Sequence, residues 1–461
     1  MATRARHLDQ DAARCGAAVR PTVVFGMGKT GLSCARFLAA RGEALMLVDT
    51  RSAPPALAEI RALLPDALFC CGPVAADALL LAKRIVVSPG VPLDHPALVA
   101  AAARGIEIGG DVELFAEMAK APVIAITGSN GKSTVTTLVG EILRADGKRV
   151  GIGGNLGTPA LDLLTEPEPD CYVLELSSFQ LEATRSLVAR VAAILNVSPD
   201  HLDRHHSLEA YAAAKARVLN GASLAVLNAD DPVVAAFAGR ARSTRMVSLE
   251  PDAPADYGVV TRLDGWWLAQ GGEPVLPVSM LGIKGRHNVF NALVALAVTD
   301  AAGAARGTQC AVLKRFAGLP HRCVLVAEKR GVAWYDDSKG TNVGAAAAAI
   351  AGIFSDRKGV LLAGGQGKGA DFGELAAAIA GRVHTVVLIG EDAERIAQTI
   401  GSAAAVRRAA SMREAVAIAA GAARPGEAVL LSPACASFDM FDDYAHRGRE
   451  FVVAVAAELG T

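Results

Sequence analysis

A glycine-rich segment in the first third of the chain could bind the phosphates of a nucleotide. An apolar run leads into Thr-Gly-Ser-Asn-Gly-Lys-Ser-Thr at residues 127–134, and the residues that follow have helical periodicity. Glycines let backbone N–H groups approach phosphate oxygens, Lys132 can reach the β- and γ-phosphates, and Ser133 or Thr134 can bind Mg²⁺. The first glycine of the usual G-x-x-x-x-G-K-S pattern would fall at Ile126, so this is a variant loop. The candidate phosphate-binding residues are Gly128, Ser129, Asn130, Gly131, Lys132, Ser133 and Thr134.

A second glycine pattern follows the first apolar run of the chain. Gly26-Met-Gly-Lys-Thr-Gly31 matches the fingerprint G-x-G-x-x-G, and Asp49 lies at the end of the next apolar run. In a dinucleotide-binding unit such glycines bring a diphosphate to a helix N-terminus, and the acid binds a ribose hydroxyl. The pattern therefore predicts a nucleotide diphosphate site without identifying the nucleotide. A plain strand-to-helix turn is the alternative interpretation.

Carboxylates at the ends of two later apolar runs suit a metal ion. Glu175 ends one run, and the segment Asn196-Val-Ser-Pro-Asp-His-Leu-Asp203 follows the next. A carboxylate at the C-terminal edge of a parallel sheet faces the ligand crevice and can hold Mg²⁺ directly or through water. We therefore expect a magnesium site beside the phosphate loop.

One lysine interrupts an apolar stripe. Helical periodicity after His206 places Lys215 on that stripe, where burial lowers the pKa of an amine because it penalises the charged form. The usual outcome is a lysine that buries its stem and extends its amine to water. A neutral amine near Mg²⁺ could instead take up CO₂ as a carbamate, and periodicity does not choose between the two. The other members of the stripe are Leu208, Tyr211, Ala212, Val218 and Leu219.

Three polar loops follow apolar runs in the last third of the chain. They cover residues 335–342, 363–372 and 431–439. Because the C-terminal ends of parallel strands meet at one edge of a sheet, these loops should converge on one crevice. Their lysines and hydroxyls suit a substrate carboxylate.

The elements that must position these residues are short apolar strands that alternate with helices. Unalternated apolar strands separated by helices are typical of parallel sheets covered on both faces. The sequence therefore predicts an α/β protein of several domains. The expected strands are Thr22–Phe25, Leu45–Val48, Ile85–Val87, Val123–Ile126, Tyr172–Leu176, Ala192–Val197, Leu224–Leu227, Val332–Tyr335, Val360–Ala363, Thr385–Ile389 and Ala428–Leu431.

Length and two breaks in the pattern predict three domains. The chain has 461 residues, which at about 150 residues per domain gives about three. Phe115–Pro122 separates the first two units, Phe316–Arg322 is expected to be a hinge, and Pro251–Pro277 should form a small β excursion. The expected boundaries are an extension at 1–20 and domains at 21–112, 113–317 and 318–461.

Composition excludes several classes of function. The 46 Lys and Arg nearly cancel the 47 Asp and Glu, which disfavours a nucleic-acid partner bound through a strongly basic surface. The eight cysteines form no C-x-x-C pair and no zinc spacing, so we interpret them as reduced. The N-terminus lacks the apolar core of a signal peptide, and no apolar stretch is long enough to span a membrane. We expect a cytoplasmic protein.

In this order and over the span from Gly26 to Phe451, these residues resemble the Mur ligase family of peptidoglycan synthesis. The phosphate loop alone is less specific, because folylpolyglutamate synthetases share it. The features that carry the resemblance further are Asp49-Thr50-Arg51, Glu175–Gln180, Asp337–Asn342 and Ser432–Phe438.

The resemblance implies a fold and an activity. The fold would have a Rossmann-like N-terminal domain, a central P-loop ATPase-like domain with a mostly parallel sheet, and a Rossmann-like C-terminal domain. They would bind a UDP-linked substrate, ATP and an amino acid respectively. The activity would be ATP-dependent addition of D-glutamate to UDP-N-acetylmuramoyl-L-alanine through an acyl phosphate, by a monomer whose C-terminal domain closes to exclude water.

The resemblance also implies site residues by matched position. Those expected at the UDP substrate are Lys29, Thr30, Asp49, Thr50, Arg51 and Asn155. Beyond the phosphate loop, those expected at ATP are Asn288, Asn291, Arg322 and Asp337. Two Mg²⁺ ions would be held by Ser133, Glu175, His201 and carbamylated Lys215. Those expected at the amino acid are Lys339, Thr341, Lys368, Ser437 and Phe438. The implied catalytic residues are Lys132, His201 and Lys215, and Tyr444 stands where a phenylalanine is expected.

Two alternatives stay open at this point. One is another amide ligase of the same kind, including a folylpolyglutamate synthetase, although a folate ligase has no need of the first fingerprint. The other is an NAD(P)-dependent dehydrogenase built on Gly26–Asp49. That reading leaves Lys132, Glu175, His201 and Lys215 unexplained.

Overall fold

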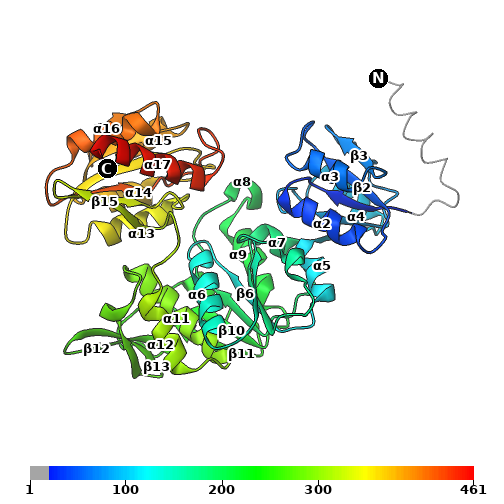
Figure 1. Cartoon of the computed structure of the whole chain (residues 1–461), viewed down its shortest axis with the longest axis horizontal. Coiled ribbons are helices and arrows are strands. Elements are labelled where there is room, and N and C mark those ends of the chain that lie inside the picture. The colour runs from blue at the N-terminus through cyan, green and yellow to red at the C-terminus, as the bar shows by residue number, and fades with distance from the viewer. Residues whose placement is uncertain (1–19, 461) are drawn as a thin grey trace.

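The computed structural model describes residues 20–460 and contains three sheets, each in its own α/β domain. In Figure 1 the N-terminal domain (blue) and the C-terminal domain (yellow to red) both lie against the central domain, at opposite ends of it. The predicted fold class, three α/β domains with mostly parallel sheets, is confirmed. The predicted extension at 1–20 lies outside the described residues except for Arg20.

The N-terminal sheet has five strands in the order β3-β2-β1-β4-β5, and every pair is parallel. This order is that of a nucleotide-binding fold, in which ligands bind outside the C-terminal ends of the strands. Its strands are β1 Thr22–Phe25, β2 Leu45–Asp49, β3 Leu68–Cys71, β4 Arg84–Val87 and β5 Glu107–Gly110. Its helices are α2 Lys29–Ala39, α3 Leu57–Leu63, α4 Pro96–Ala103 and α5 Asp111–Met118.

The central sheet has nine strands in the order β14-β13-β12-β11-β10-β9-β6-β8-β7. The strands from β12 to β7 pair in parallel, and β12, β13 and β14 form an antiparallel meander where the β excursion was predicted. Its strands are β6 Val123–Thr127, β7 Val150–Gly154, β8 Cys171–Glu175, β9 Val191–Ile194, β10 Leu224–Asn228, β11 Ser243–Val247, β12 Tyr257–Arg262, β13 Gly265–Gln270 and β14 Glu273–Pro277. Its α-helices are α6 Lys132–Ala145, α7 Ser178–Glu182, α8 Leu202–His205, α9 Leu208–Ala216, α10 Pro232–Ala235, α11 Arg286–Ala301 and α12 Arg306–Arg315.

The C-terminal sheet has six strands in the order β15-β16-β20-β17-β18-β19, and only β15 is antiparallel to its neighbour. Its strands are β15 Val324–Lys329, β16 Val332–Asp336, β17 Gly359–Gly364, β18 Val383–Ile389, β19 Ala405–Arg408 and β20 Ala428–Leu431. Its helices are α13 Val343–Ile353, α14 Gly373–Ile379, α15 Ala393–Ile400, α16 Met412–Ala422 and α17 Tyr444–Leu459.

The buried central strands were predicted well, whereas five edge strands and the partly exposed β11 were missed. Each of the eleven expected strands is present, although β9 ends at Ile194 and not at Val197. The sequence pattern missed β3, β5, β7, β11, β15 and β19. Strands such as β19, with the sequence Ala-Val-Arg-Arg, are partly exposed and carry charges, so they lack an unbroken apolar run.

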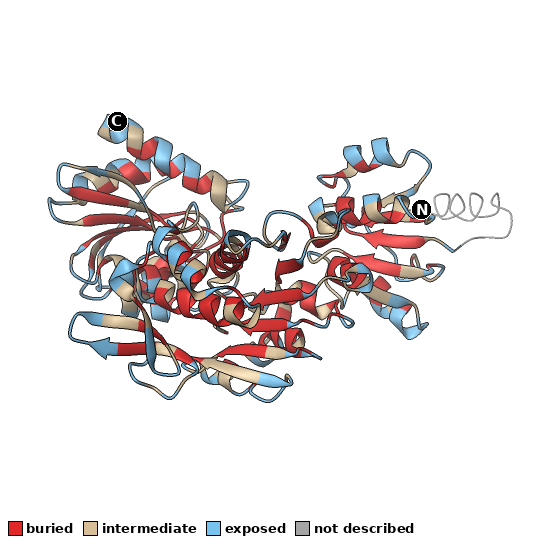
Figure 2. Ribbon diagram, turned by 60° about the horizontal axis from the view of Figure 1, so that its bottom comes forward, coloured by how far each residue is buried: buried red, intermediate tan, exposed pale blue. Residues whose placement is uncertain are grey.

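Apolar residues of the N-terminal and central domains form one continuous buried cluster. It extends from Val24 on β1 through Phe115 on α5 to Tyr172 on β8. The C-terminal domain has two buried clusters of its own, one on each face of its sheet. In Figure 2 the inner strands of the sheets are buried while several covering helices expose their outer faces, which agrees with unalternated apolar strands between amphipathic helices.

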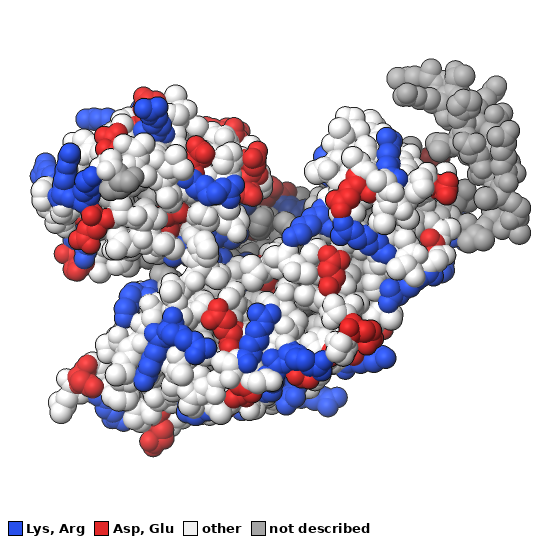
Figure 3. Space-filling model, in the orientation of Figure 1, with Lys and Arg blue, Asp and Glu red and all other residues white. Residues whose placement is uncertain are grey.

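The surface carries no block of one charge on the face drawn in Figure 3, where Lys and Arg alternate with Asp and Glu over all three domains. This agrees with the formal net charge of −1. Among residues 20–460, no helix is both long and apolar enough to cross a lipid bilayer.

Candidate active site

The phosphate loop lies between β6 and α6, as predicted. Gly128 and Gly131 have positive φ angles of 153° and 83°, and Gly131 is the residue that precedes the first turn of α6. A Cβ atom at Gly131 would lie 2.6 Å from Oδ1 of Asn291, so a side chain there would strain the backbone and collide with α11. Ile126, the position of the missing first glycine, is fully buried within β6. The phosphate loop therefore begins after β6, later than in the usual pattern. The backbone N–H groups at the start of α6 are the groups that would face a phosphate.

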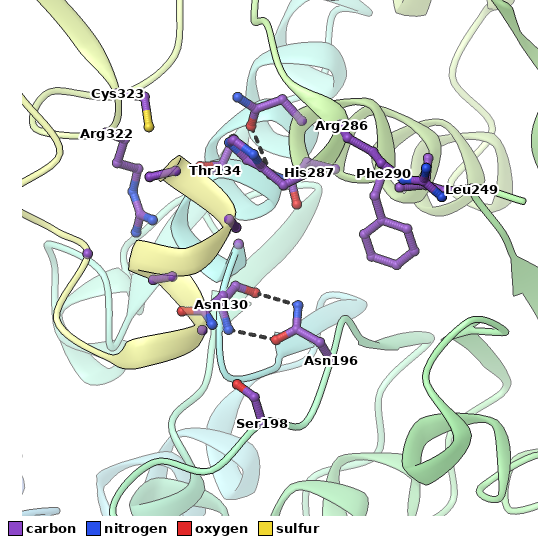
Figure 4. Close-up of a pocket in the computed structure, with 18 of the residues that line it drawn as sticks. Asn130, Thr134, Asn196, Ser198, Leu249, Arg286, His287, Phe290, Arg322 and Cys323 are labelled. Atoms are coloured by element: carbon purple, nitrogen blue, oxygen red, sulfur yellow. Dashed lines mark hydrogen bonds between the residues drawn. The ribbon is translucent and has the colours of Figure 1, made fainter. Parts of the chain in front are cut away.

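The side chain of Asn196 holds the loop through two hydrogen bonds to the backbone of Asn130. The side-chain Oδ1 of Asn196 accepts from the backbone N–H of Asn130 at 2.8 Å, and Nδ2 of Asn196 donates to the carbonyl of Asn130 at 3.2 Å. Figure 4 shows the side chain of Asn196 facing the loop beside the pocket. Asn196 lies two residues after the end of β9 and begins the polar segment 196–203 that was expected beside a metal ion, but its contact with the loop was not predicted.

Lys132 and Lys215 converge on one carbonyl. Their Nζ atoms lie 2.9 and 2.8 Å from the carbonyl oxygen of Gly128. Burial lowers the pKa of both amines, and the charge of Lys132 lowers the pKa of Lys215 further, against the opposing charges of Asp200 and Glu175. Two ammonium groups at one acceptor repel each other, so the site favours a neutral Lys215.

The predicted burial of Lys215 is confirmed. Its side chain on α9 is 1% exposed and its Nζ lies 4.3 Å from the ring centroid of Tyr211. The Tyr211 hydroxyl in turn pairs with Oγ of Ser129 at 3.2 Å. The amine does not reach water along its stem, which removes the ordinary interpretation of a snorkelling lysine.

Glu175 ends β8 with one carboxylate oxygen unpaired. Its side chain is 2% exposed, Oε1 accepts from Nδ2 of Asn155 at 2.7 Å, and Oε2 has no hydrogen-bond partner. An unpaired buried carboxylate oxygen is costly unless a cation or donor completes it. Among the described residues, no three His, Cys, Asp or Glu side chains lie close enough to form a complete metal site. A single unpaired carboxylate oxygen such as Oε2 of Glu175 fits Mg²⁺, because proteins usually hold this ion through one or two side chains while phosphate and water supply the other ligands.

His201 lies close enough to Asp200, Lys368 and Lys132 for their charges to act on its ring. Its ring packs edge-on against Phe179 with centroids 4.9 Å apart, and Nε2 lies 3.6 Å from Oδ2 of Asp200. Burial lowers the pKa of His201 to about 4, despite the nearby charge of Asp200. At neutral pH the ring is therefore uncharged and has a lone pair available for a metal ion or a substrate proton.

A cavity of about 450 Å³ separates the phosphate loop from the C-terminal domain. Arg322, in the predicted hinge, extends across it and donates from Nη2 to Oγ of Ser133 at 2.9 Å. Asn288 and Asn291 line the cavity from α11, where Nδ2 of Asn291 donates to Oδ1 of Asn288 at 3.0 Å. In Figure 4 the labelled side chains around the cavity come from both domains. Further lining residues, which sequence patterns did not indicate, are Asn228, Asp230, Leu249, Glu250, Arg286, His287 and Phe290.

Two titratable groups of the C-terminal domain line the same cavity. Burial raises the pKa of Asp337 to about 7, although Ser432 and Arg322 oppose the rise. Burial also lowers the pKa of Lys339 to about 8, and its Nζ lies 3.8 Å from the ring centroid of Tyr444. The tyrosine found where a phenylalanine was expected thus supplies the aromatic face for this lysine.

The three C-terminal loops meet, as predicted. Oγ of Ser432 donates to Oδ2 of Asp337 at 2.7 Å, which joins the first loop to the third. The backbones of Gln366 and Ala436 exchange hydrogen bonds of 3.0 and 2.9 Å, which joins the second loop to the third.

The loops also touch the central domain. Nζ of Lys368 lies 3.8 Å from Oδ1 of Asp200. The amides of Asn342 and Asn130 pair at 3.1 and 3.3 Å. Of the other residues predicted to contact the amino acid, Ser437 is 2% exposed and Phe438 is 70% exposed, while Thr341 lies between Lys339 and Asn342 in the first loop.

The first glycine fingerprint forms a second site at the C-terminal end of β1. The Asp49 carboxylate, which the fingerprint matches to a ribose, accepts from the N–H of Met27 at 2.7 Å and from Nη2 of Arg51 at 2.7 Å. Burial alone would raise the pKa of Asp49, but the hydrogen bonds from Arg51 and Met27 outweigh it and hold the pKa below its ordinary value. Asp49 thus orders the Gly26–Gly31 loop, and its binding of a ribose stays a prediction.

This second site touches the central domain. Lys29 donates to the carbonyl of Gly157, two residues after Asn155 in the loop that follows β7. Thr30 stands next to it in the first turn of α2, and Thr50 lies between Asp49 and Arg51. The residues predicted for the UDP substrate therefore come from two domains. One of them, Asn155, is hydrogen-bonded to Glu175 and so connects this site to the phosphate-loop site.

Comparison with known proteins covers most of the chain. Three family models match: the Mur ligase MurD-like N-terminal domain at residues 20–110, the Mur ligase middle domain at 126–299, and the Mur ligase glutamate ligase domain at 321–435. The chain is 51% identical to the UDP-N-acetylmuramoylalanine--D-glutamate ligase of Nitrosococcus oceani over 94% of this chain and 96% of that one. It is also 51% identical to the Pseudomonas aeruginosa protein of the same name, over 94% and 97%.

Solved structures share the fold at low identity. The UDP-N-acetylmuramate-alanine ligase MurC from Thermotoga maritima is 19% identical, with a TM-score of 0.61 over 95% of this chain and 99% of that one. A pseudomurein peptide ligase type C from Methanothermus fervidus is 18% identical, with a TM-score of 0.61 over 94% and 99%.

A phosphate loop that faces lysine-bearing loops of a second α/β domain across a cavity defines a ligase that uses ATP to join two substrates. The matched models and near-full-length relatives place the chain in a family within that class. The chain belongs to the Mur ligase family.

Proposed function

We propose that the protein joins D-glutamate to the alanyl carboxylate of UDP-N-acetylmuramoyl-L-alanine and converts ATP to ADP and phosphate. The observation that carries this proposal is the cavity in which the phosphate loop faces Lys339 and Asp337 of the first C-terminal loop. The substrates follow from relatives about half identical over nearly their whole length. These relatives do not favour the dehydrogenase or the folate ligase.

The first step activates a carboxylate. A carboxylate is a poor electrophile, so its oxygen attacks the γ-phosphorus of ATP and ADP leaves, which gives an acyl phosphate. Lys132 and Arg322 are placed to stabilise the transferring phosphoryl group, because Lys132 lies on the loop and Arg322 reaches Ser133 at the start of α6. Asn130, held by Asn196, fixes the loop that carries these charges.

The second step forms the amide. The amine of D-glutamate, after losing a proton, attacks the acyl carbon, and phosphate leaves from the tetrahedral intermediate. Lys339 and Lys368 are placed to bind the carboxylates of D-glutamate, since both lie on the converging loops. Thr341, Ser437 and Phe438 complete this proposed subsite.

We propose that residues around the phosphate loop hold two Mg²⁺ ions. Glu175 supplies an unpaired buried oxygen, Ser133 a hydroxyl, and His201 an uncharged ring. Bound Mg²⁺ would neutralise charge on the phosphates during transfer. We further propose that Lys215 is carbamylated, because its buried, crowded amine favours the neutral form that reacts with CO₂. The carbamate would add a negative oxygen ligand and remove the repulsion with Lys132.

The N-terminal domain is proposed to bind the UDP part of the substrate. Lys29, Thr30, Asp49, Thr50 and Arg51 lie at the C-terminal edge of its sheet, where nucleotides bind in such folds. We also propose that the protein is a monomer and that its domain limits lie at Met118, where α5 ends, and at 317/318; the limit predicted at 112/113 falls inside α5.

An ADP-release assay tests the proposal. The protein is supplied with ATP, Mg²⁺ and UDP-N-acetylmuramoyl-L-alanine, together with one member of a panel of D- and L-amino acids. We expect release of ADP only with D-glutamate, at one ADP per amide formed. Equal or faster release with L-glutamate, or with another amino acid, would contradict the proposed substrate.

A further inference from the structure

A buried arginine of the C-terminal domain has no part in the reaction steps above. Arg447 lies in the first half of α17 and is 1% exposed. Burial lowers its pKa to about 10. Within residues 20–460 its guanidinium makes no ion pair, so backbone carbonyls and one hydroxyl compensate its charge. A buried charge held in this way is expensive, which calls for a reason specific to its surroundings.

All five N–H donors of Arg447 bind the loops proposed to hold D-glutamate. Nε donates to Oγ of Ser338 at 3.0 Å and Nη2 to the Ser338 carbonyl at 2.8 Å. Nη1 and Nη2 each donate to the Cys435 carbonyl at 3.1 Å, and Nη1 donates to the Ala436 carbonyl at 3.3 Å. Ser338 belongs to the first loop and Cys435 and Ala436 to the third. The planar fork therefore sets the spacing between the two loops.

The peptide groups bound by Arg447 continue into the site. In a trans peptide the carbonyl and the next N–H point in opposite directions. The peptide group between Ser338 and Lys339 directs its N–H away from Arg447. This N–H of Lys339 donates to the carbonyl of His321 at 3.0 Å. The peptide after Cys435 directs the N–H of Ala436 to the carbonyl of Gln366 at 2.9 Å, in the second loop. Arg447 thus reaches the hinge and all three loops through single peptide groups.

Two neighbours on α17 support the same loop. The carbonyl of Tyr444 accepts from Oγ of Ser338 at 2.8 Å, and its ring lies under Lys339. Gly448 allows close packing on the hinge, because a Cβ there would lie 2.2 Å from Nδ1 of His321. The first turns of α17 therefore contact the first loop, although no residue of α17 is among those that line the cavity.

We propose that Arg447 is a positioning residue for the amino-acid substrate, which fixes Lys339 and Ser437 at the separation that the carboxylates of D-glutamate require. This inference rests on the proposed function. It assigns to Arg447 no contact with substrate. Its removal should weaken amino-acid binding more than ATP binding, because the phosphate loop receives no hydrogen bond from it.

Kinetics of matched variants test the proposal. Arg447→Met removes the donors at similar length, Arg447→Lys keeps the charge without the fork, and Arg449→Met changes an exposed arginine on the same helix. We expect the KM for D-glutamate to rise about tenfold or more in Arg447→Met and less in Arg447→Lys. The KM for ATP and for the UDP substrate should stay within about threefold. An unchanged KM for D-glutamate, or an equal change in all three KM values, would overturn the proposal.

Amide hydrogen exchange of the unliganded protein supplies a readout that does not depend on the substrate. In Arg447→Met, or in Arg447→Lys if the first variant does not fold, exchange should accelerate in 335–342 and 431–439 and stay unchanged in 127–134. Unchanged exchange in the two loops would overturn the proposal. Failure of the wild-type protein to use D-glutamate would instead refute the proposed function, and the exchange result would still decide whether Arg447 orders the loops.

Discussion

The two interfaces of the central domain differ in kind. Towards the N-terminal domain the contact is apolar and continuous, since one buried cluster contains both Phe115 and Tyr172, whose rings pack edge-on at 4.9 Å. Towards the C-terminal domain the contacts described are polar pairs around a cavity: Asn342 with Asn130, Arg322 with Ser133, and Lys368 with Asp200. Among the described residues, no buried cluster joins these two domains.

This difference bears on how the reaction proceeds. Separating an apolar interface exposes apolar surface at a free-energy cost of about 25 cal/mol per Å², whereas breaking one hydrogen-bonded polar pair costs only about 0.5–1.5 kcal/mol. We therefore expect the N-terminal and central domains to move as one body, and the C-terminal domain to open and close over ATP. Closure would exclude water from the acyl phosphate, and opening would release products. Substitutions at the interface with the C-terminal domain should therefore change catalysis, whereas a substitution at the interface with the N-terminal domain should change stability.

The largest effect is expected at the phosphate loop. Lys132→Ala removes the amine that would stabilise the transferring phosphoryl group, so ADP release should fall by about a thousandfold or more. The matched control is Lys120→Ala, which changes an exposed lysine outside the site and should retain activity. A coupled ADP assay measures both variants. ADP release within tenfold of wild type in Lys132→Ala would contradict the assigned role.

A nearly equal loss is expected from Lys215→Ala, because a carbamate ligand would vanish with the amine. A small carboxylate such as acetate should enter the vacated space and restore part of the activity. Rates are measured with and without added acetate, with chloride at equal ionic strength as the control. Full activity of Lys215→Ala without acetate would refute the carbamate, and so would a failure of both acetate and formate to restore any rate.

A selective effect is expected at Lys368. Lys368→Ala should raise the KM for D-glutamate by about tenfold or more and change the KM for ATP by much less, since the lysine lies on the second loop, where a substrate carboxylate would bind. Initial rates are measured while each substrate is varied in turn. Lys358→Ala changes an exposed lysine on the same domain and serves as control. Equal rises in both KM values would place Lys368 in domain closure instead.

The smallest effect concerns the other interface and affects stability. Asp111 is buried where α5 meets α7, and its carboxylate accepts from Nε2 of Gln180 at 3.1 Å. Burial raises its pKa from 3.8 to about 6. Between these values the folded state binds a proton that the unfolded state has lost, so the stability contributed by Asp111 falls as pH rises and stays low above about pH 6.

Asp111→Asn should remove that cost. We expect the free energy of unfolding to rise by about 1–3 kcal/mol at pH 8 and to be nearly unchanged at pH 4. Urea unfolding at the two pH values measures this, and ligase activity should be retained. A stabilisation that is the same at both pH values would contradict the raised pKa of Asp111. A large loss of ligase activity would show that this interface takes part in the chemistry.

Local patterns predicted the parts of the site that are close in sequence. The phosphate loop, the burial of Lys215 and the convergence of three loops follow from strand–loop–helix order, since parallel strands bring their C-terminal ends together. Long-range pairs were not predictable. The contact between Asn130 and Asn342 joins residues 212 positions apart, and its geometry depends on how two domains pack.

Two further residues show why composition and periodicity are insufficient. Arg447 shares the buried face of α17 with Phe451, Ala454 and Val455, so helical spacing could have indicated its burial but not its hydrogen-bond partners. Asp49 matched a ribose-binding position, yet its carboxylate is engaged by Arg51, two residues away. A sequence pattern gives a residue's type and place in the chain, whereas its hydrogen-bond partners depend on the packed structure.

Distances between labels on the three domains test the central claim most directly. Labels at Arg61, Arg240 and Arg407, all exposed, report the N-terminal, central and C-terminal domains. A non-hydrolysable ATP analogue and the UDP substrate are then added. The account predicts that the mean distance between the labels at Arg240 and Arg407 changes and that its distribution becomes narrower. The distance between the labels at Arg240 and Arg61 should stay constant. A change confined to the Arg61 pair, or no change in either, would contradict it.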